Sequence, residues 1–292
     1  GAKSKASYSH SIAIGNNAIS SGENSVAIGL QSEATGHGSM ALGFSAEASG
    51  IGALAIAGAK AIGDRSFAFG SFSESQGEYS FSFGYQADAT SDFSFSFGNR
   101  ATAGGAGATA IGAYSTAGGT GAIAIGDTTH ASGTGTVAFG QGTQAWGDYA
   151  FAAGKMSKAQ QSNAIAIGIA SVASRSGSIA FGSSNSSQGL YSNSIGHVCT
   201  STQDYSSAIG QNCVASGVGS TAIGNMCSSS NDYAVAVGYN CSATNTYSSA
   251  FGYNALASGR WSVAIGDAAY SDGDRSVALG YSNNATGSFS HA

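Results

Sequence analysis

A five-residue phrase returns along this chain at fixed intervals and constrains its fold more than any other feature. The phrase is Ser-Val-Ala-Ile-Gly at Ser25–Gly29 and Ser-Val-Ala-Leu-Gly at Ser276–Gly280. From Gly70 to Gly280 a glycine closes it at every fourteenth residue, whereas Ala57 takes the glycine place in an irregular stretch near 57–70. A period this regular is typical of a solenoid. We therefore expect one continuous solenoid of about 20 coils over residues 1–292, cut from a longer protein.

Composition excludes several other classes. Glycine accounts for 45 of 292 residues, but it has no triplet period and proline is absent, which excludes collagen. A hydrophobic content of 42% is sufficient for an ordered core. The net charge of −5 offers no basic face for nucleic acid, and the apolar runs are too short to cross a membrane.

Each phrase alternates small and large side chains, as Ser66, Phe67, Ala68 and Phe69 illustrate. Alternation with a period of two, bounded by glycine, predicts a β-strand. A weaker strand follows each glycine, so one repeat reads strand, turn, strand, turn. Fourteen residues form a short perimeter, and the two strands offer each other only Ala, Ser and Gly. The sequence therefore predicts an all-β fold of flattened, two-sided parallel coils with the small residues inside.

The large apolar residue before each glycine forms a column that the coil cannot bury. A stack of coils about 4.8 Å apart would expose on the order of 1,000 Å² of this stripe, more than a soluble monomer shows. We therefore expect an obligate, in-register homo-oligomer with the column at its interface. The column consists of Ile14, Ile28, Leu42, Ile56, Phe69, Phe83, Phe97, Ile111, Ile125, Phe139, Ile167, Phe181, Ile195, Ile209, Ile223, Val237, Phe251, Ile265 and Leu279.

The phrase at Asn24–Gly29, followed by Ser32, Ala34 and Gly36, resembles the head repeat of trimeric autotransporter adhesins, the YadA-like head. The resemblance covers nearly the whole chain. It implies a single-stranded left-handed parallel β-roll, three of which pack side by side as a homotrimer. It also implies a non-enzymatic head on the bacterial surface that binds an extracellular matrix protein or a cell-surface glycan or protein. Similar repeats resemble phage tail-fibre shafts, so a virion fibre segment is the alternative.

Aromatic residues on the turns and on the outward strand are the candidate surface contacts. Trp146 lies on the outward strand, where nothing in the coil requires a large aromatic side chain. The others precede the phrase and either recognise a ligand or shield the edge of the subunit seam. They are Tyr191, Tyr205, Tyr233, Tyr247 and Trp261. A third interpretation, ice binding by outward threonines such as Thr35 and Thr90, is weakened because Gln76, Trp146 and Gln160 interrupt that column.

Four cysteines recur at the repeat interval and form a ladder, at Cys199, Cys213, Cys227 and Cys241. Each lies three residues after its glycine, and so inside the coil. Parallel side chains on one wall do not converge on a metal and are awkward to bridge, which favours buried free thiols over disulfides. Free thiols would fit a reducing compartment and hence a phage origin. We expect no catalytic, cofactor or metal residues, since the histidines fall at different repeat offsets.

Overall fold

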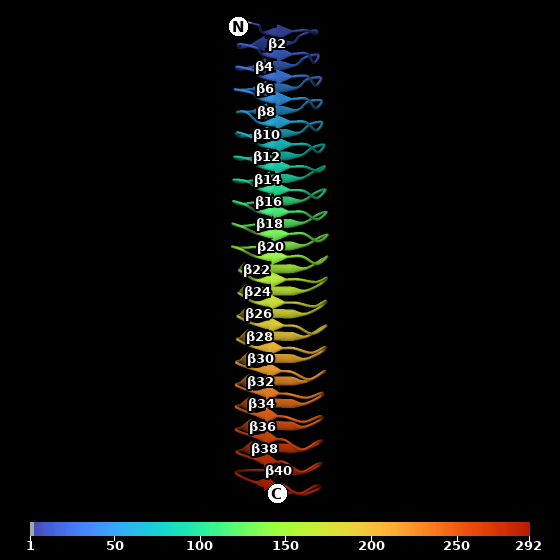
Figure 1. Ribbon diagram of the computed structural model, residues 1–292, viewed down its shortest axis with the longest axis vertical. Helices are drawn as coiled ribbons and strands as arrows, with labels where there is room; N and C mark the ends of the chain where they lie inside the picture. Colours follow the sequence, from blue (N-terminus) through green and yellow to red (C-terminus); the bar gives the residue numbers. More distant parts are fainter. Residues whose placement is uncertain (1–2) are drawn as a thin grey trace. The chain divides into compact units, whose positions relative to one another are not determined.

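The computed structural model describes residues 3–292, in which the chain consists of β-strands and turns. It forms two compact units, Gly1–Tyr149 and Ala150–Ala292, which are called unit 1 and unit 2 below. Within each unit the chain winds as a parallel β-solenoid, and a long and a short strand alternate in every coil (Figure 1). Together the units contain about 20 turns with a 14-residue spacing. No helix long and apolar enough to span a membrane occurs within residues 3–292.

Unit 1 contains strands β1 to β21. Its long strands are β2 (Ile12–Ile14), β4 (Val26–Ile28), β6 (Met40–Leu42), β8 (Leu54–Ile56), β10 (Phe67–Phe69), β12 (Phe81–Phe83), β14 (Phe95–Phe97), β16 (Thr109–Ile111), β18 (Ile123–Ile125) and β20 (Val137–Phe139). Its short strands are β1 (Lys5–Ala6), β3 (Ile19–Ser20), β5 (Glu33–Ala34), β7 (Glu47–Ala48), β9 (Lys60–Ala61), β11 (Glu74–Ser75), β13 (Asp88–Ala89), β15 (Thr102–Ala103), β17 (Thr116–Ala117), β19 (His130–Ala131) and β21 (Gln144–Ala145).

Unit 2 contains strands β22 to β41. Its long strands are β22 (Phe151–Lys155), β24 (Ile165–Ile169), β26 (Ile179–Ser183), β28 (Asn193–His197), β30 (Ser207–Gln211), β32 (Thr221–Asn225), β34 (Val235–Tyr239), β36 (Ser249–Tyr253), β38 (Val263–Asp267) and β40 (Val277–Leu279). Its short strands are β23 (Lys158–Ala159), β25 (Val172–Ala173), β27 (Ser186–Ser187), β29 (Thr200–Ser201), β31 (Val214–Ala215), β33 (Ser228–Ser229), β35 (Ser242–Ala243), β37 (Leu256–Ala257), β39 (Tyr270–Ser271) and β41 (Asn284–Ala285).

Within each unit, every strand pairs in parallel with its equivalent one coil away, so identical repeat positions stack. In β12 and β14, for example, Phe81 lies opposite Phe95 and Phe83 opposite Phe97. The short strands pair in the same manner, with Glu74 opposite Asp88. This in-register stacking turns each repeat position into a column along the unit. A side chain's nearest neighbours are therefore the residues one repeat before and one repeat after it.

The interior of each coil is thin and contains small side chains. Ala27 and Ala34, from the long and the short strand of neighbouring coil segments, are both fully buried. Some buried serines form hydrogen bonds across the same space: Ser75 Oγ donates to the Phe67 carbonyl oxygen at 2.7 Å and lies 2.8 Å from Ser82 Oγ. The prediction that the small residues of the phrase lie inside the coil is confirmed.

The long strands differ from the predicted five-residue strand. The serine that opens the phrase lies in the preceding turn, because the N–H of Ser25 donates to the carbonyl oxygen of Gly22 at 3.3 Å and its Oγ donates to the same oxygen at 2.6 Å. A buried backbone N–H needs a hydrogen-bond acceptor, and here the carbonyl oxygen three residues earlier in the turn provides it. In unit 2 most long strands continue instead beyond the glycine, as Ile165–Ile169 shows.

The closing glycine is required by backbone contact between coils. At Gly112 the φ angle is +123°, and a Cβ atom would lie 2.3 Å from the Gly126 carbonyl oxygen one coil away. The φ angle lies outside the conformations that L-residues adopt readily, and the distance is far below van der Waals contact. Both constraints recur in every unit 2 coil from Gly154 to Gly266, where the corresponding distance is 1.8–2.2 Å.

Candidate functional site

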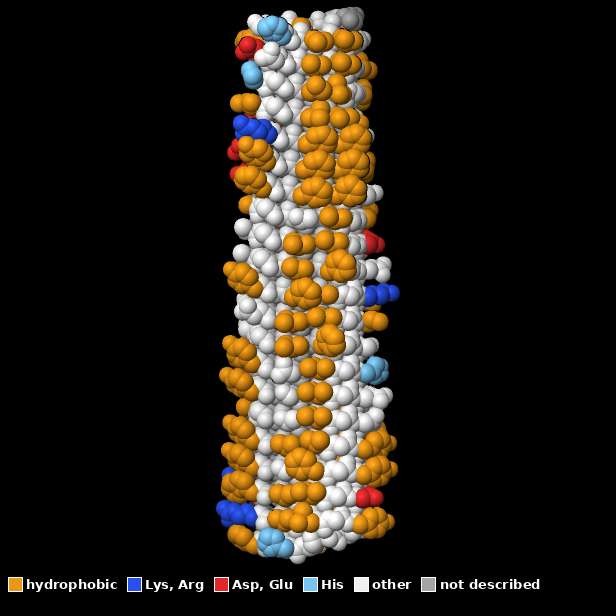
Figure 2. All heavy atoms as spheres, turned by 180° about the vertical axis from the view of Figure 1, so that it is seen from behind, with side chains coloured by type: hydrophobic (Ala, Val, Ile, Leu, Met, Phe, Trp, Pro, Cys, Tyr) orange, Lys and Arg blue, Asp and Glu red, His pale blue; other side chains and the backbone are white. Residues whose placement is uncertain are grey.

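The outward face of the long strands carries two columns of large side chains, called the apolar stripe below. They occupy the second and fourth positions of the phrase, on the opposite face of the strand from the buried alanines. In a single chain the side chains of Phe97, Phe139 and Phe181 are 44%, 56% and 51% exposed. Figure 2 shows the stripe as orange side chains on the outer face of each unit. The predicted assignment of faces, with small residues inside and large residues outside, is confirmed.

Phenylalanine rings fill both columns of the stripe in three successive coils of unit 1. The ring centroids of Phe69 and Phe83 lie 4.7 Å apart, and those of Phe83 and Phe97 lie 5.0 Å apart. The neighbouring column repeats this stacking through Phe67, Phe81 and Phe95, at 4.8 and 5.1 Å. The rings are nearly parallel, so each covers the faces of its neighbours and leaves its outer edge exposed. This block is the most aromatic part of the stripe.

Four polar side chains interrupt the first column of the stripe in unit 2. Asn193, Ser207, Thr221 and Ser249 are all half-buried. Asn193 Nδ2 donates to Ser207 Oγ at 3.4 Å, a weak bond between adjacent coils. The second column stays apolar beside them, with Ile195 and Ile209 half-buried. The stripe therefore narrows to one apolar column in these four coils, whereas Val235 restores the first column between Thr221 and Ser249.

The turn that leads into each phrase is called the entry turn below, and in several coils it carries an aromatic side chain. Every residue of this column has a left-handed backbone, including Tyr233, Tyr247 and Trp261 at φ angles of 58°, 59° and 57°. Glycine occupies the same position elsewhere, as at Gly121, whose φ angle is 63°. The conformation costs a residue with a Cβ atom about 1–2 kcal/mol. The aromatic residues therefore stand where glycine or asparagine would fit with less strain.

Stacking between coils offsets part of this strain. The centroids of Tyr233 and Tyr247 lie 5.1 Å apart, and those of Tyr247 and Trp261 lie 6.0 Å apart. Aromatic pairs of this kind contribute about 0.5–1.5 kcal/mol beyond their buried area. The guanidinium carbons of Arg260 and Arg275 lie 4.0 and 4.8 Å from the centroid of Trp261. The sequence did not reveal these cation–π contacts, because they depend on side-chain direction at the turn.

The predicted surface contacts are all exposed but do not form one continuous ladder. Tyr191 and Tyr205 make a separate stack, with centroids 5.8 Å apart. The Gly219 position separates it from the Tyr233 stack, because glycine supplies no ring there. Trp146 lies on the outward side just after β21 and is 45% exposed. Within unit 2 the structure thus brings together Tyr233, Tyr247 and Trp261, and separately Tyr191 and Tyr205. Trp146 belongs to unit 1.

Aspartates on the entry turn link neighbouring coils, a feature that the sequence analysis missed. Asp232 Oδ1 accepts a hydrogen bond from the backbone N–H of Val218 at 2.8 Å, and Asp204 Oδ1 accepts one from Leu190 at the same distance. Asp92 and Asp148 do the same for Glu78 and Thr134. The sequence does contain a pattern that could have predicted these bonds. Each aspartate lies two residues before its phrase, and the four are separated by whole multiples of the fourteen-residue repeat.

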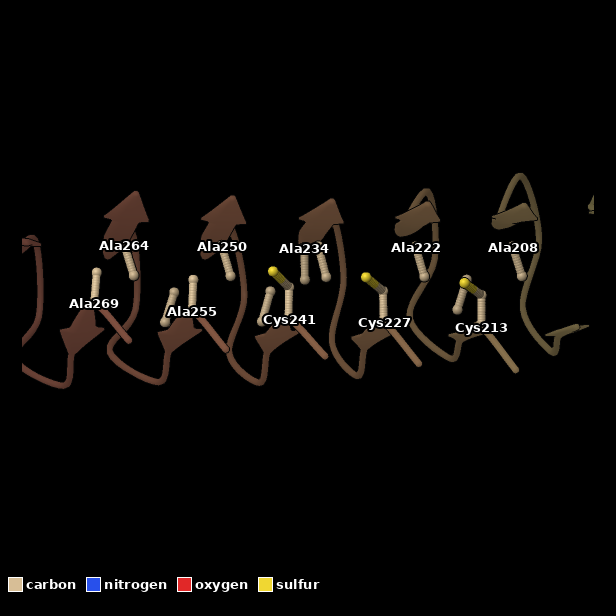
Figure 3. Packing of buried hydrophobic residues seen from close by; sticks show 14 of the residues in the cluster. Ala208, Cys213, Ala222, Cys227, Ala234, Cys241, Ala250, Ala255, Ala264 and Ala269 are labelled. Carbon is tan, nitrogen blue, oxygen red and sulfur yellow. The ribbon is translucent and has the colours of Figure 1, made fainter. Parts of the chain in front are cut away.

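The cysteine ladder lies in the interior of unit 2. All four thiols are free, as the spacing predicted, and their residues are 0–1% exposed. Cys199 Sγ donates to the carbonyl oxygen of Gly210 at 3.2 Å, and the other three repeat this contact with the glycine one coil farther on. Figure 3 shows Cys213, Cys227 and Cys241 directed toward the alanines of the facing strands. Ser171 makes the same contact with Gly182 at 3.0 Å, so the thiols act as structural donors.

The thiols should be unreactive in the folded protein. Burial raises the pKa of Cys227 and of Cys241, and a hydrogen bond with Cys199 together with burial raises the pKa of Cys213, whereas that hydrogen bond lowers the pKa of Cys199. Reaction needs an accessible thiolate, and none of the four is accessible. We expect a disulfide exchange reagent at pH 8 to label no cysteine before unfolding and all four in denaturant. Fast labelling of the native protein would contradict the buried ladder.

Asp88 carries a charge on the outward face of unit 1 that the fold disfavours. Burial raises the pKa of its carboxyl group, and Glu74, its partner one coil away, raises it further. A carboxyl group with a raised pKa in the folded state favours folding when protonated, so this contribution is lost as the pH rises through that pKa. We expect Asp88→Asn to raise the melting temperature at pH 7 and to have little effect at pH 3. Thr102→Ser, one coil away, serves as the control; a lower melting temperature for Asp88→Asn at pH 7 would refute the assignment.

Within residues 3–292, no group of three or more His, Cys, Asp or Glu side chains could hold a metal ion. The recurring geometry is instead the parallel coil with buried alanines, a left-handed entry turn and an outward stripe. The chain matches the YadA head domain repeat over residues 9–32, 34–56, 75–101, 103–129, 131–155, 159–185, 215–240, 243–269, 257–283 and 271–290. The chain belongs to the YadA head family. Members of this family are adhesins of bacterial surfaces and are generally not enzymes.

Among solved structures, this YadA-type head is similar to the crystal structure of the collagen-binding domain of the Yersinia adhesin YadA. The two sequences are 23% identical, the match covers 64% of this chain, and the TM-score is 0.17. The chain spans 65% of the length of that domain. No curated protein matches this YadA-type head in sequence.

Proposed function

We propose that this chain is the adhesive head of a trimeric fibre displayed on a bacterial surface, outside the cell, and that it binds an extracellular matrix protein or a cell-surface glycan or protein. The observation that carries the proposal is the apolar stripe, in a chain of the YadA head family. In this proposal the two units form one continuous left-handed β-roll. The chain takes no part in a reaction and serves as a rigid, multivalent surface.

Assembly of several copies is supported by the free energy of burying the stripe, and the number three is carried over from the family that the chain belongs to. Full burial of one large apolar side chain is worth about 1.5–3 kcal/mol relative to leaving it exposed. Ile14, Phe139 and Leu279 are 55%, 56% and 51% exposed in the single chain, so each retains roughly half of that gain for assembly. Because identical positions stack in register, a second and a third copy can cover the columns coil by coil. The trimer interface is therefore proposed at the residue before each phrase glycine, from Ile14 to Leu279.

Binding is proposed to occur on the aromatic entry turn and on the outward short strands, which lie away from the stripe. Tyr191, Tyr205 and Tyr233 are 59%, 62% and 51% exposed there. A trimer presents each such group three times, and multivalent attachment raises avidity about 10²–10⁴-fold over one site. Weak individual contacts would then be sufficient for adhesion.

Surface-immobilised collagen, fibronectin and laminin test the proposal. Collagen is included because the similar Yersinia domain is described as collagen-binding. The intact chain should sediment at three times its own mass of 28.6 kDa and bind at least one of these proteins or intact host cells. Tyr233→Ala and Tyr247→Ala together should weaken binding without changing the sedimenting mass. Absence of binding to every matrix protein and to host cells, by a chain that sediments as a trimer, would overturn the adhesive role and leave a fibre shaft.

A further inference from the structure

The one short coil of unit 1 opens a notch in the turns that follow the long strands. In a regular coil two residues stand between the phrase glycine and the buried small residue, as Phe44 and Ser45 do. The next coil has only Gly58 between Ala57 and Ala59, because its interval is one residue shorter. The missing side chains leave a cavity of about 470 Å³, lined by Phe44, Ser45, Ala57, Gly58, Ser71 and Phe72. This cavity is called the notch below.

Two exposed aromatic side chains bound the notch. Phe44 belongs to the coil before the short one and is 62% exposed, and Phe72 belongs to the coil after it and is 69% exposed. Tyr85 packs edge-on against Phe72, with the ring centroids 6.0 Å apart, and so supports it from the far side. Elsewhere in unit 1 exposed rings one coil apart stack, as Tyr79 and Phe93 do at 5.4 Å. Phe44 and Phe72 have no ring between them.

The notch has the size of a small-molecule site. Phe44 is the first turn residue after its phrase glycine and Phe72 is the second, so the two rings border the cavity from different turn positions in coils on either side of the short one. The volume lies within the range of about 300–1,000 Å³ that is usual for small-molecule sites.

The shorter turn also leaves a hydrogen-bond acceptor unused. In the regular coils the second turn residue donates its N–H to the carbonyl oxygen of the first turn residue one coil earlier, as Ser45 does to Leu30 at 2.9 Å. The short coil lacks that second residue, so within residues 3–292 no N–H donates to the carbonyl oxygen of Phe44. An acceptor beside an apolar cavity favours a ligand that carries hydroxyl donors.

Charged groups extend the polar side of the notch. A smaller adjoining cavity of about 190 Å³ is lined by Gly58, Lys60, Phe72, Ser73 and Glu74. Lys60 Nζ lies 3.2 Å from a Glu47 carboxylate oxygen, and Glu74 lies opposite Lys60 in the parallel register. A carboxylate and an ammonium side by side offer acceptors and donors to neighbouring hydroxyl groups. They carry no net positive charge that would select an anion.

We propose that the notch binds one pyranose ring of a glycan. The C–H faces of the sugar pack against Phe44 and Phe72, one hydroxyl donates to the Phe44 carbonyl oxygen, and others reach Lys60 and Glu74. This inference rests on the proposed adhesive function, for which it names a ligand class and a site. The site is distinct from the apolar stripe and from the aromatic entry turn, and no other described coil has this shortened turn.

Saturation-transfer NMR on the intact chain tests the site, with methyl β-D-glucopyranoside, methyl β-D-galactopyranoside and methyl N-acetyl-β-D-glucosaminide as probes. At least one probe should receive saturation on its ring C–H protons. Phe44→Ala and Phe72→Ala should each weaken binding about tenfold, the loss of roughly one aromatic contact. Tyr281→Ala is the matched control, because Tyr281 is 76% exposed at the same turn position as Phe44 and should leave binding unchanged.

Insertion of one serine after Gly58 provides a second, independent variant. It restores the regular repeat interval and supplies the N–H that the Phe44 carbonyl oxygen lacks, so it should preserve the fold and abolish sugar binding. Failure of all three glycosides to bind the wild type would overturn the inference, as would equal binding by the insertion variant. Preferential binding of N-acetylproline methylamide, or loss of the trimer on insertion, would reassign the notch to a peptide or to a second subunit. Matrix adhesion that persists in the insertion variant would leave the proposed function intact.

Discussion

Replacement of Phe83 by aspartate is expected to leave the protein unable to assemble. Phe83 lies between Phe69 and Phe97 in the stripe, with ring centroids 4.7 and 5.0 Å away. An aspartate there places a charge among aromatic rings, and assembly would bury it without a partner. Burial of an unpaired charge costs several kcal/mol, and a symmetric trimer incurs the cost three times. Sedimentation equilibrium should therefore give a mass near 28.6 kDa for Phe83→Asp and three times that mass for the wild type.

Thr116→Asp is the matched control for this experiment. Thr116 is half-buried on the outward side of the short strand β17, away from the stripe. Its neighbours in the column are Thr102 and His130, which leave an aspartate hydrated. The variant should sediment like the wild type. Ile111→Asp, in the stripe of the coil that contains Thr116, should behave like Phe83→Asp. Equal tolerance at Ile111 and Thr116 would show that the stripe does not face another subunit.

The second large effect is expected from Gly112→Ala. A Cβ atom there would lie 2.3 Å from the Gly126 carbonyl oxygen, at a φ angle of +123°. Neither the contact nor the angle can relax alone, because the next coil repeats the same backbone in register. We expect a loss of at least about 4 kcal/mol in the free energy of unfolding, the range reserved for severe local defects. Chemical denaturation followed by circular dichroism measures this loss.

Gly121→Asn separates this steric effect from the general cost of replacing a glycine. Gly121 has a φ angle of 63°, and a Cβ atom there would meet nothing within 4 Å. Asn24 and Asn163 occupy the same repeat position with φ angles of 57° and 59°. The variant should change stability by less than about 1 kcal/mol. A similar loss for Gly112→Ala and Gly121→Asn would mean that contact between coils does not fix the glycine column.

The repeating parts of the fold could be predicted from the sequence, because every repeat places small residues on one face of the strand and large residues on the other. Ala27 and Ala34 are fully buried, and the alternation around them was enough to assign the faces. The regular period also gave the in-register pairing of Phe83 with Phe97. The strand limits were less accurate, because the first serine of the phrase bonds within the turn and alternation does not record that bond. Handedness depends on turn geometry and was implied only by the resemblance to the family.

The candidate sites were harder to predict, because they arise where the repeat is broken. The exposed aromatic turns were visible as a column, but the guanidinium groups over Trp261 depend on the direction of Arg260 and Arg275. The short interval after Ala57 was visible as an irregularity. The irregularity leaves a cavity bordered by Phe44 and Phe72, and this cavity is evident only in the three-dimensional structure. A one-residue deletion in a repeat predicts a binding site only when the positions of the neighbouring side chains are known.

Hydrogen bonding restricted to adjacent coils has a consequence for the gene. The N–H of Gln31 reaches the carbonyl oxygen of Asn16, and no described coil forms a backbone bond beyond the next one. Loss or duplication of a whole repeat by unequal recombination would therefore rejoin two surfaces that already match. Related strains could carry heads of different length with the same stability per coil. A change of any other size stays in the turn where it falls, as the short coil after Ala57 shows, because the strands on either side of that coil still pair in register.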